Sequence, residues 1–323
     1  MKRWVVLGVI VVFAVLSGAI ASGALKFGSG ATTKAADGAT VYVSRDFGAR
    51  RVDEAKLRRV PAGDTVMRLL QREFEVTTRY GGGFVQSIEG LAGGTDGRRR
   101  SDWFYYVNGI EASDGAAAHK VAGGDRIWWD HHDWNAAQRI PAVVGSYPEP
   151  FVSGSDGRQI PLSLVCAGEE RSCEEVSTRL GEAGVKGIAR TGIGAGFGRK
   201  LLRIIVGPWE QIRSDPAVAQ LARGPGGSGV YARPRGDRLL LLDAEGRVTR
   251  TLTQAGGLVA ATRFQDQEPT WIVTGTDDAG VAAAAASLRE DLLHNRFAVA
   301  VEDGRDVPLP VRLARRRPRG RSP

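Results

Sequence analysis

The sequence predicts an α+β protein: a first domain in which one helix is gripped by a mixed sheet, then a second α/β domain, with an apolar helix in front of both. Three observations predict this. Strand patterns surround one amphipathic helix in residues 39–138, strands and helices alternate in residues 160–310, and residues 4–25 carry no charge. The chain has 323 residues, 42% of them hydrophobic, and this length favours two domains over one.

The N-terminal segment has the composition of a membrane anchor or an export signal. Lys2–Arg3 precede the uncharged run Trp4–Leu25, which is long enough to cross a bilayer as a helix. The basic flank should stay in the cytoplasm, so residues after a short linker, 26–38, are expected outside. The chain would then be a single-pass protein of the cell membrane. A cleaved signal peptide is the alternative, because the small residues of Ala19–Ala21 suit processing, and the protein would then be secreted.

Two strands and a helix open the first domain. Thr40–Ser44 alternates as a strand, and Lys56–Val60 is expected to pair with it. Pro61–Asp64 then breaks the sheet, and its last residue is expected to cap the helix, because a carboxylate can accept the free amides of the first turn. Val66–Phe74 repeats apolar residues at helical spacing, so the helix should have one apolar face that packs against the sheet.

Two aromatic strands follow. Asn108–Gly109 is the preferred two-residue hairpin turn, so Trp103–Val107 before it should be a strand, and a further strand leads to Trp134. Trp103, Trp128, Trp129 and Trp134 are four of the seven tryptophans in the chain. Aromatic side chains that the core does not use are available to stack on a flat ligand.

The motifs of this region resemble a known family. They are Thr65–Leu70, Tyr80–Val85, Ser87–Gly90, Trp103–Gly109 and Gly124–Ile127. Roughly residues 39–134 are similar to the transcobalamin-like C-terminal domain, a bacterial domain of unknown function related to the β-domain of transcobalamin and intrinsic factor. The resemblance implies a β-grasp-like fold and a soluble ligand, with cobalamin or a related compound as the leading candidate. It implies no catalytic residues.

The candidate ligand contacts are aromatic residues at the strand ends and hairpin of this region, with one histidine as a polar contact. They are Tyr80, Phe84, Tyr106, Trp128, Trp134 and His132. Strand alternation puts the side chains of Tyr106, Trp128 and His132 on the face opposite Trp103 and Trp129. If the register instead places Trp128 in the core under the helix, its ring serves stability and not binding.

The Asp130–Asp133 segment is the one cluster with metal-ligand chemistry. Neighbouring strand residues point to opposite faces, so His131 and His132 cannot bind one ion without a bend. We therefore expect no metal site; the segment is either a polar strand end or part of ligand binding beside the tryptophans. The sequence has no Gly-x-Ser-x-Gly elbow, and no Cys/His or paired-carboxylate arrangement stands out. We expect no enzyme and no catalytic residues.

Residues 139–159 are punctuated by proline and are expected to connect the two domains. In the second domain we expect strands at Leu201–Val206, Thr270–Thr274 and Phe297–Val301, a helix at Ala279–Leu293 capped by Thr276 or Asp277, and a meander of Val230–Arg233, Arg238–Leu242 and Arg247–Leu252. The order of strands and helices indicates an α/β domain, and its family is not evident.

Cys166 and Cys173 are the two cysteines of the chain, and export makes a disulfide between them chemically reasonable. Ser163–Cys166 is expected to be a strand and Glu169–Leu180 the helix after it, so the bridge would join a strand end to the first helical turn. Two free thiols are the alternative. Metal binding would need a further ligand, and no histidine lies nearby in sequence.

The formal net charge of +8 is concentrated in the final residues, 311–323. The arginines there are Arg312, Arg315, Arg316, Arg317, Arg319 and Arg321. A basic tail interrupted by proline is expected to be disordered and solvated, or to contact anionic lipid or a cell-wall polymer. Nucleic acid is not an expected partner, because an exported protein rarely meets it.

These observations favour an extracytoplasmic, membrane-anchored ligand-binding protein that captures cobalamin or a related cofactor and passes it to a membrane transporter. No tightly held cofactor is expected. A cell-envelope adhesion or structural protein, which binds polysaccharide or a partner protein through the same aromatic residues, is the alternative. A hydrolase whose residues meet only in the folded chain is a third hypothesis.

Overall fold

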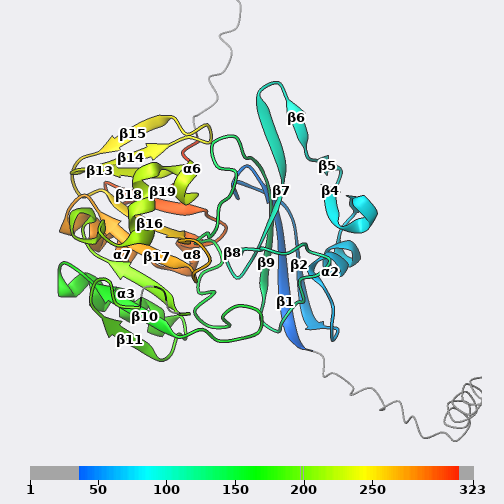
Figure 1. Ribbon diagram of the computed structural model, residues 1–323, viewed down its shortest axis with the longest axis horizontal. Helices are drawn as coiled ribbons and strands as arrows, with labels where there is room; N and C mark the ends of the chain where they lie inside the picture. Colours follow the sequence, from blue (N-terminus) through cyan, green and yellow to red (C-terminus); the bar gives the residue numbers. More distant parts are fainter. Residues whose placement is uncertain (1–35, 197, 199, 313–323) are drawn as a thin grey trace, which may run out of the picture. The chain divides into compact units, whose positions relative to one another are not determined.

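The first part of the chain forms a mixed sheet that carries one helix on one face (Figure 1). The computed structural model describes residues 36–196, 198 and 200–312; the predicted apolar helix, most of the linker and most of the basic tail lie outside these ranges. None of the helices within the described ranges is long and apolar enough to cross a bilayer.

The first sheet has the strand order β2-β1-β9-β7-β6, and β8 pairs with β7. Its strands are β1 (Ala36–Arg45), β2 (Arg50–Val60), β6 (Gly94–Asp96), β7 (Arg99–Val107), β8 (Ile110–Glu111) and β9 (Arg126–Asp133). β1 and β9 run parallel and the other neighbours run antiparallel, which confirms the predicted mixed sheet. Both Asn108 and Gly109 have positive φ, as the predicted hairpin turn between β7 and β8 requires.

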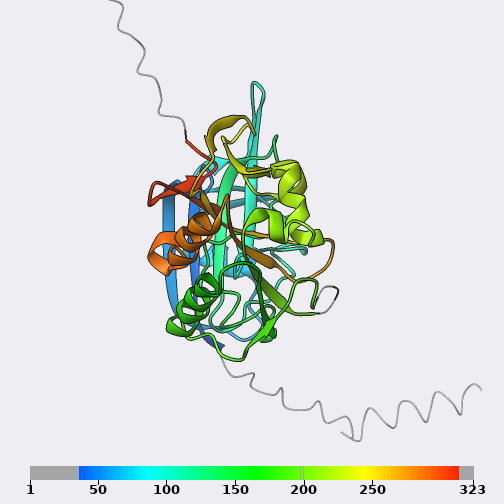
Figure 2. The same cartoon turned by 90° about the vertical axis from the view of Figure 1, so that its left-hand side faces the viewer.

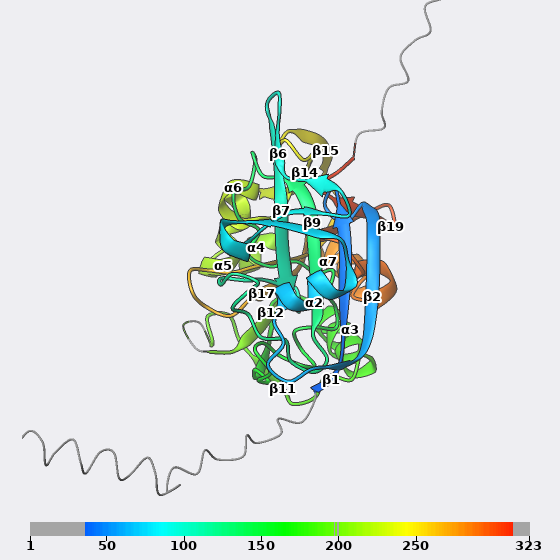
Figure 3. The ribbon, with the colours of Figure 1, turned by 90° about the vertical axis from the view of Figure 1, so that its right-hand side faces the viewer.

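Helix α2 (Val66–Glu73) lies against one face of this sheet, in front of the strands in Figure 3. Its cap corrects the sequence-based expectation. The hydroxyl of Thr65 accepts the amide of Arg68 at 3.3 Å, while the carboxylate of Asp64 instead pairs with Arg72 at 2.7 Å. A small antiparallel sheet lies beside the helix: β3 (Val76–Arg79), β4 (Phe84–Ile88) and β5 (Leu91–Ala92).

The second sheet has the strand order β11-β10-β12-β17-β16-β18-β19. Its strands are β10 (Leu162–Cys166), β11 (Ile188–Thr191), β12 (Leu202–Val206), β16 (Gly257–Thr262), β17 (Thr270–Gly275), β18 (Ala298–Glu302) and β19 (Arg305–Leu309). The first four in spatial order are parallel and the last three pairings are antiparallel. α3 (Glu170–Glu182, green) and α7 (Asp278–Ala286, orange) pack together on one face (Figure 2).

The predicted long helix at Ala279–Leu293 is two helices. α7 ends at Ala286, and α8 (Glu290–Leu293) begins after Arg289, whose backbone is extended at φ −139° and ψ 145°. The hydroxyl of Ser287 donates to Asp306 at 2.7 Å and holds the break against β19. The alanine-rich sequence has no apolar period that would mark this break. Asp277 caps α7 through the amide of Gly280, as expected for one of the two predicted capping residues.

The predicted meander is present as β13 (Ala232–Arg235), β14 (Arg238–Leu242) and β15 (Val248–Leu252), all antiparallel. Four short helical segments precede it along the chain: α4 (Trp209–Ile212), α5 (Pro216–Ala219), η2 (Gln220–Arg223) and α6 (Pro225–Ser228). The carboxylate of Asp215, which caps α5, also pairs with the buried guanidinium of Arg203 on β12.

The middle of the connector, residues 142–151, is part of the core. Val143, Val144, Tyr147 and Phe151 are each buried there. One cluster of buried side chains contains residues of the first sheet, the connector, the second sheet and the meander together. The described chain from Ala36 onward is correspondingly one compact unit.

Cys166 and Cys173 lie at disulfide distance, with Cα atoms 5.9 Å apart. Cys166 is the last residue of β10 and Cys173 lies in the first turn of α3, so the predicted placement of the pair is confirmed.

Candidate functional site

The aromatic face that the sequence offers to a ligand is covered by the second part of the chain. Tyr106 and Trp128 are 0% and 2% exposed and are register partners on β7 and β9. The ring of Phe297 lies 5.7 Å and 5.0 Å from their rings, centroid to centroid. The predicted facing is right, because Trp103 and Trp129 lie in the core under α2. However, the opposite face is a second core, and Tyr106 and Trp128 are not open to a ligand there.

His132 is buried in the same core and bonds to Asp130, whose carboxylate lies 2.9 Å from the histidine Nδ1. The same carboxylate accepts the Ser44 hydroxyl at 2.5 Å and the amides of Phe47 and Gly48 at 3.0 Å and 2.8 Å. Through these four hydrogen-bond partners, Asp130 holds the turn between β1 and β2 against β9. The arrangement fits a structural role.

His131 points to the other face, as strand alternation predicts, and lies against Trp103 with ring centroids 5.2 Å apart. Burial lowers the pKa of His131, so the neutral ring is favoured. Within residues 36–196, 198 and 200–312, no three potential ligand side chains are grouped to hold a metal ion.

Two of the six predicted contact residues meet at the surface. Tyr80 and Phe84 are 86% and 41% exposed, and their rings form an edge-to-face pair 6.3 Å apart. They flank the glycines between β3 and β4, on the α2 side of the first sheet (Figure 1). Trp134 lies elsewhere, beneath the guanidinium of Arg100 at 4.0 Å. The structure therefore does not bring the six residues into one site.

A cleft of about 490 Å³ lies where the first part of the chain meets the second. We call it the junction cleft. From the first part it is lined by β7, β8 and the loop that follows them, and from the second part by the end of the connector and by loops of the second sheet. Its charged residues carry both signs: Glu111, Asp114, Asp156, Glu268, Arg158, Lys200 and Arg263.

His119 is one of two buried polar residues that line the junction cleft, 9% exposed beside Glu111 at 8%. Its Nδ1 lies 2.9 Å from the carboxylate of Asp114, and its carbonyl accepts the amide of Val66 at 3.0 Å, which ties the loop to the start of α2. Its Nε2 has no hydrogen-bond partner and lies 3.9 Å from the carboxylate of Asp156. An imidazole held at one nitrogen can offer the other to a ligand as donor or acceptor.

Asp114 and His119 are not among the residues predicted from the sequence. The available signal was weak: a histidine, one of four in the chain, five residues after an aspartate in a polar loop. Asp156 comes from the connector, and its approach to His119 depends on how the two parts of the chain pack.

Residues 63–133 match the family model of a domain of unknown function, DUF4430. The matched segment begins just before α2 and ends with β9, and it contains Tyr80, Phe84, Asp114 and His119. The curated proteins contain no match to the chain.

Proposed function

We propose that this chain, which carries a DUF4430 domain, is an extracytoplasmic ligand-binding protein that holds a polar ligand, or one polar part of a larger ligand, in the junction cleft. The observation that carries the proposal is the partnerless Nε2 of the buried His119 in a cleft between two parts of the chain. Buried polar atoms are generally satisfied, so a partnerless one at a cleft is a place where a ligand or water can bond. The cleft volume, about 490 Å³, falls in the range of small-molecule sites.

The chemistry of the cleft suits a ligand with hydrogen-bond donors and acceptors. Lys200 and Arg263 offer positive charge, and Glu268 and Asp156 offer negative charge, so a neutral or zwitterionic polar molecule fits better than a strong anion. The resemblance of residues 39–134 to the transcobalamin-like C-terminal domain supports cobalamin or a related compound as the leading ligand. A compound of that size would enter this cleft with one part, such as an amide side chain. Uptake through a membrane transporter, with the N-terminal segment as anchor, completes the proposal.

Equilibrium titration of cobalamin and cobinamide into the purified protein tests this. Lys200→Ala and His119→Asn should weaken binding by about tenfold or more each, because hydrogen bonds to charged or buried polar groups are lost. Lys186→Ala, which removes an exposed lysine just before β11 that does not line the junction cleft, is the matched control and should bind as the parent does. Absence of binding for both ligands, or equal affinity in all variants, contradicts the proposal.

The exposed pair Tyr80 and Phe84 favours a second function, in which the protein binds a cell-envelope polysaccharide or a partner protein. Aromatic rings left open to water can stack on sugar rings or on an apolar patch. Co-sedimentation with insoluble cell-wall polysaccharide tests this with the double variant Tyr80→Ala/Phe84→Ala, which should lose retention. Val248→Ala is the control, because Val248 is a 47% exposed apolar residue on β15. Equal retention of both variants argues against this second function.

A further inference from the structure

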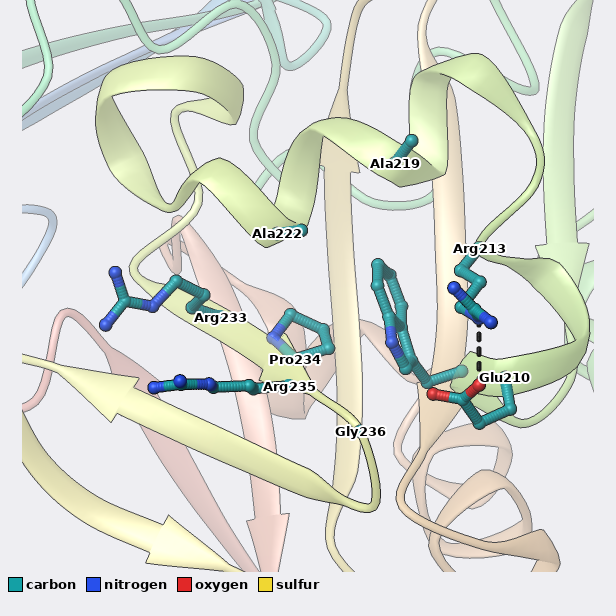
Figure 4. A pocket seen from close by; sticks show the side chains of 9 residues that line it. Glu210, Arg213, Ala219, Ala222, Arg233, Pro234, Arg235 and Gly236 are labelled. Atoms are coloured by element: carbon teal, nitrogen blue, oxygen red, sulfur yellow. Dashed lines mark ion pairs between the residues drawn. The ribbon is translucent and has the colours of Figure 1, made fainter.

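A cleft of about 660 Å³ lies in the second part of the chain, between the β13–β14 hairpin and the short helices that precede it (Figure 4). We call it the arginine cleft. Its lining residues are Trp209, Glu210, Arg213, Ala219, Ala222, Arg233, Pro234, Arg235 and Gly236. In Figure 4, Arg233, Pro234 and Arg235 follow one another along β13, and Ala219 and Ala222 face them from the helical side.

The arginine cleft carries unbalanced positive charge. Arg213 pairs with Glu210 at 2.8 Å, the one acidic residue of the lining. Arg233 and Arg235 form no ion pair with any acidic residue in the described part of the chain. Two guanidinium groups, two residues apart on the same face of one strand, are therefore available to bind an anion from outside the chain.

Arg233 adds a second, independent observation. Its Nε is buried and has no hydrogen-bond partner. A buried donor without an acceptor is unfavourable, and a carboxylate or phosphate oxygen is the acceptor that a guanidinium binds best, often through two parallel hydrogen bonds. Arg235, by contrast, is exposed at the mouth, where it can meet the same group from the solvent side.

The remaining lining is apolar. Trp209 is 6% exposed and Pro234 is buried, so both belong to the wall, and the methyl groups of Ala219 and Ala222 are exposed toward solvent. Such a wall accepts a ring or a short alkyl group next to the anion. We propose that the arginine cleft binds a small organic oxyanion, with its carboxylate or phosphate on Arg233 and Arg235 and its apolar body against the exposed methyl groups of Ala219 and Ala222.

Calorimetric titration of the full chain with phenyl phosphate and with benzoate tests this and distinguishes the two anions. At least one probe should bind saturably, inorganic phosphate should bind about tenfold more weakly because it lacks the apolar body, and benzyl alcohol should not bind. Arg235→Gln and Arg233→Gln should each weaken the bound probe about tenfold or more, because each removes hydrogen bonds to a charged group. Arg233→Lys keeps the charge without the planar fork and should recover only part of the affinity.

Arg171→Gln is the matched control, because Arg171 is an exposed arginine on α3 and does not line the cleft. It should bind as the parent does. Arg235 is exposed, so Arg235→Gln should fold normally. Binding to this variant can therefore be measured even if the Arg233 variants are destabilised. Affinity that is unchanged in Arg235→Gln, or absence of saturable binding by both phenyl phosphate and benzoate, overturns the proposal.

Discussion

Replacing Trp128 by alanine should destabilise the whole folded unit. The indole is 2% exposed, its Nε1 donates to the Ser44 hydroxyl at 2.7 Å, and Phe297 packs against its ring at 5.0 Å. Truncating a buried tryptophan to alanine costs about 3–5 kcal/mol of unfolding free energy. The lost hydrogen bond adds about 1 kcal/mol. The Ser44 hydroxyl stays satisfied by Asp130, so no large desolvation penalty follows, and the expected total is about 4–6 kcal/mol.

Equilibrium unfolding in guanidinium chloride, followed by far-UV circular dichroism, measures this change. Trp128→Phe should lose less, because one ring remains to contact Phe297, and it extends the series if the alanine variant folds poorly. Trp134→Ala is the control. Trp134 is only partly buried and packs under Arg100 at 4.0 Å, so its loss should be about 1 kcal/mol or less.

The shared core predicts a second result of the same unfolding experiment. Trp128 belongs to a sheet of the first part and Phe297 to the second part, so both parts should unfold in one transition. A loss below about 1.5 kcal/mol for Trp128→Ala, far under the range for a buried aromatic, would refute the packing argument. Two transitions, of which Trp128→Ala shifts one, would refute it as well.

The remaining predictions concern other parts of the molecule. Gly145→Ala should cost about 1–3 kcal/mol by overpacking, because a Cβ there would lie 2.6 Å from the Trp128 ring; thermal melting checks it. Mass spectrometry without reductant should find Cys166 and Cys173 joined, and two alkylatable thiols in native protein would contradict this. Reduction should cost about 2–3 kcal/mol, because the closed loop is short. Burial lowers the pKa of His131 below its unfolded value of about 6.5, so its neutral form supports stability above that pH. The melting temperature should therefore drop from pH 7.5 to 5.5, and His131→Phe should flatten the drop. A reporter fused after Pro323 should work only outside the cytoplasm.

Local patterns were enough to predict most elements of the fold. The hairpin at Asn108 and Gly109, the stripe of α2 and the meander β13–β15 all occur where the sequence places them, because turn chemistry and apolar period act over a few residues. Errors arose where a local signal was ambiguous. Asp64 and Thr65 are both good caps, and the pairing of Asp64 with Arg72, two turns along the same helix, decided between them. The break after Ala286 is set by contacts with β19, which an alanine run cannot reveal.

In the candidate sites, too, some features follow from local sequence patterns and others only from long-range packing. Strand alternation by itself determined that Tyr106, Trp128 and His132 share one face of the first sheet, opposite Trp103 and Trp129. What covers that face was decided only by the tertiary structure, in which Phe297, far along the chain, packs on it. The junction cleft likewise needs Asp156 beside His119, and the arginine cleft needs the short helical segments α4, α5 and η2 beside β13. Periodicity says which side a residue faces, because the strand repeat is local; burial and partners depend on long-range packing, which no local pattern encodes.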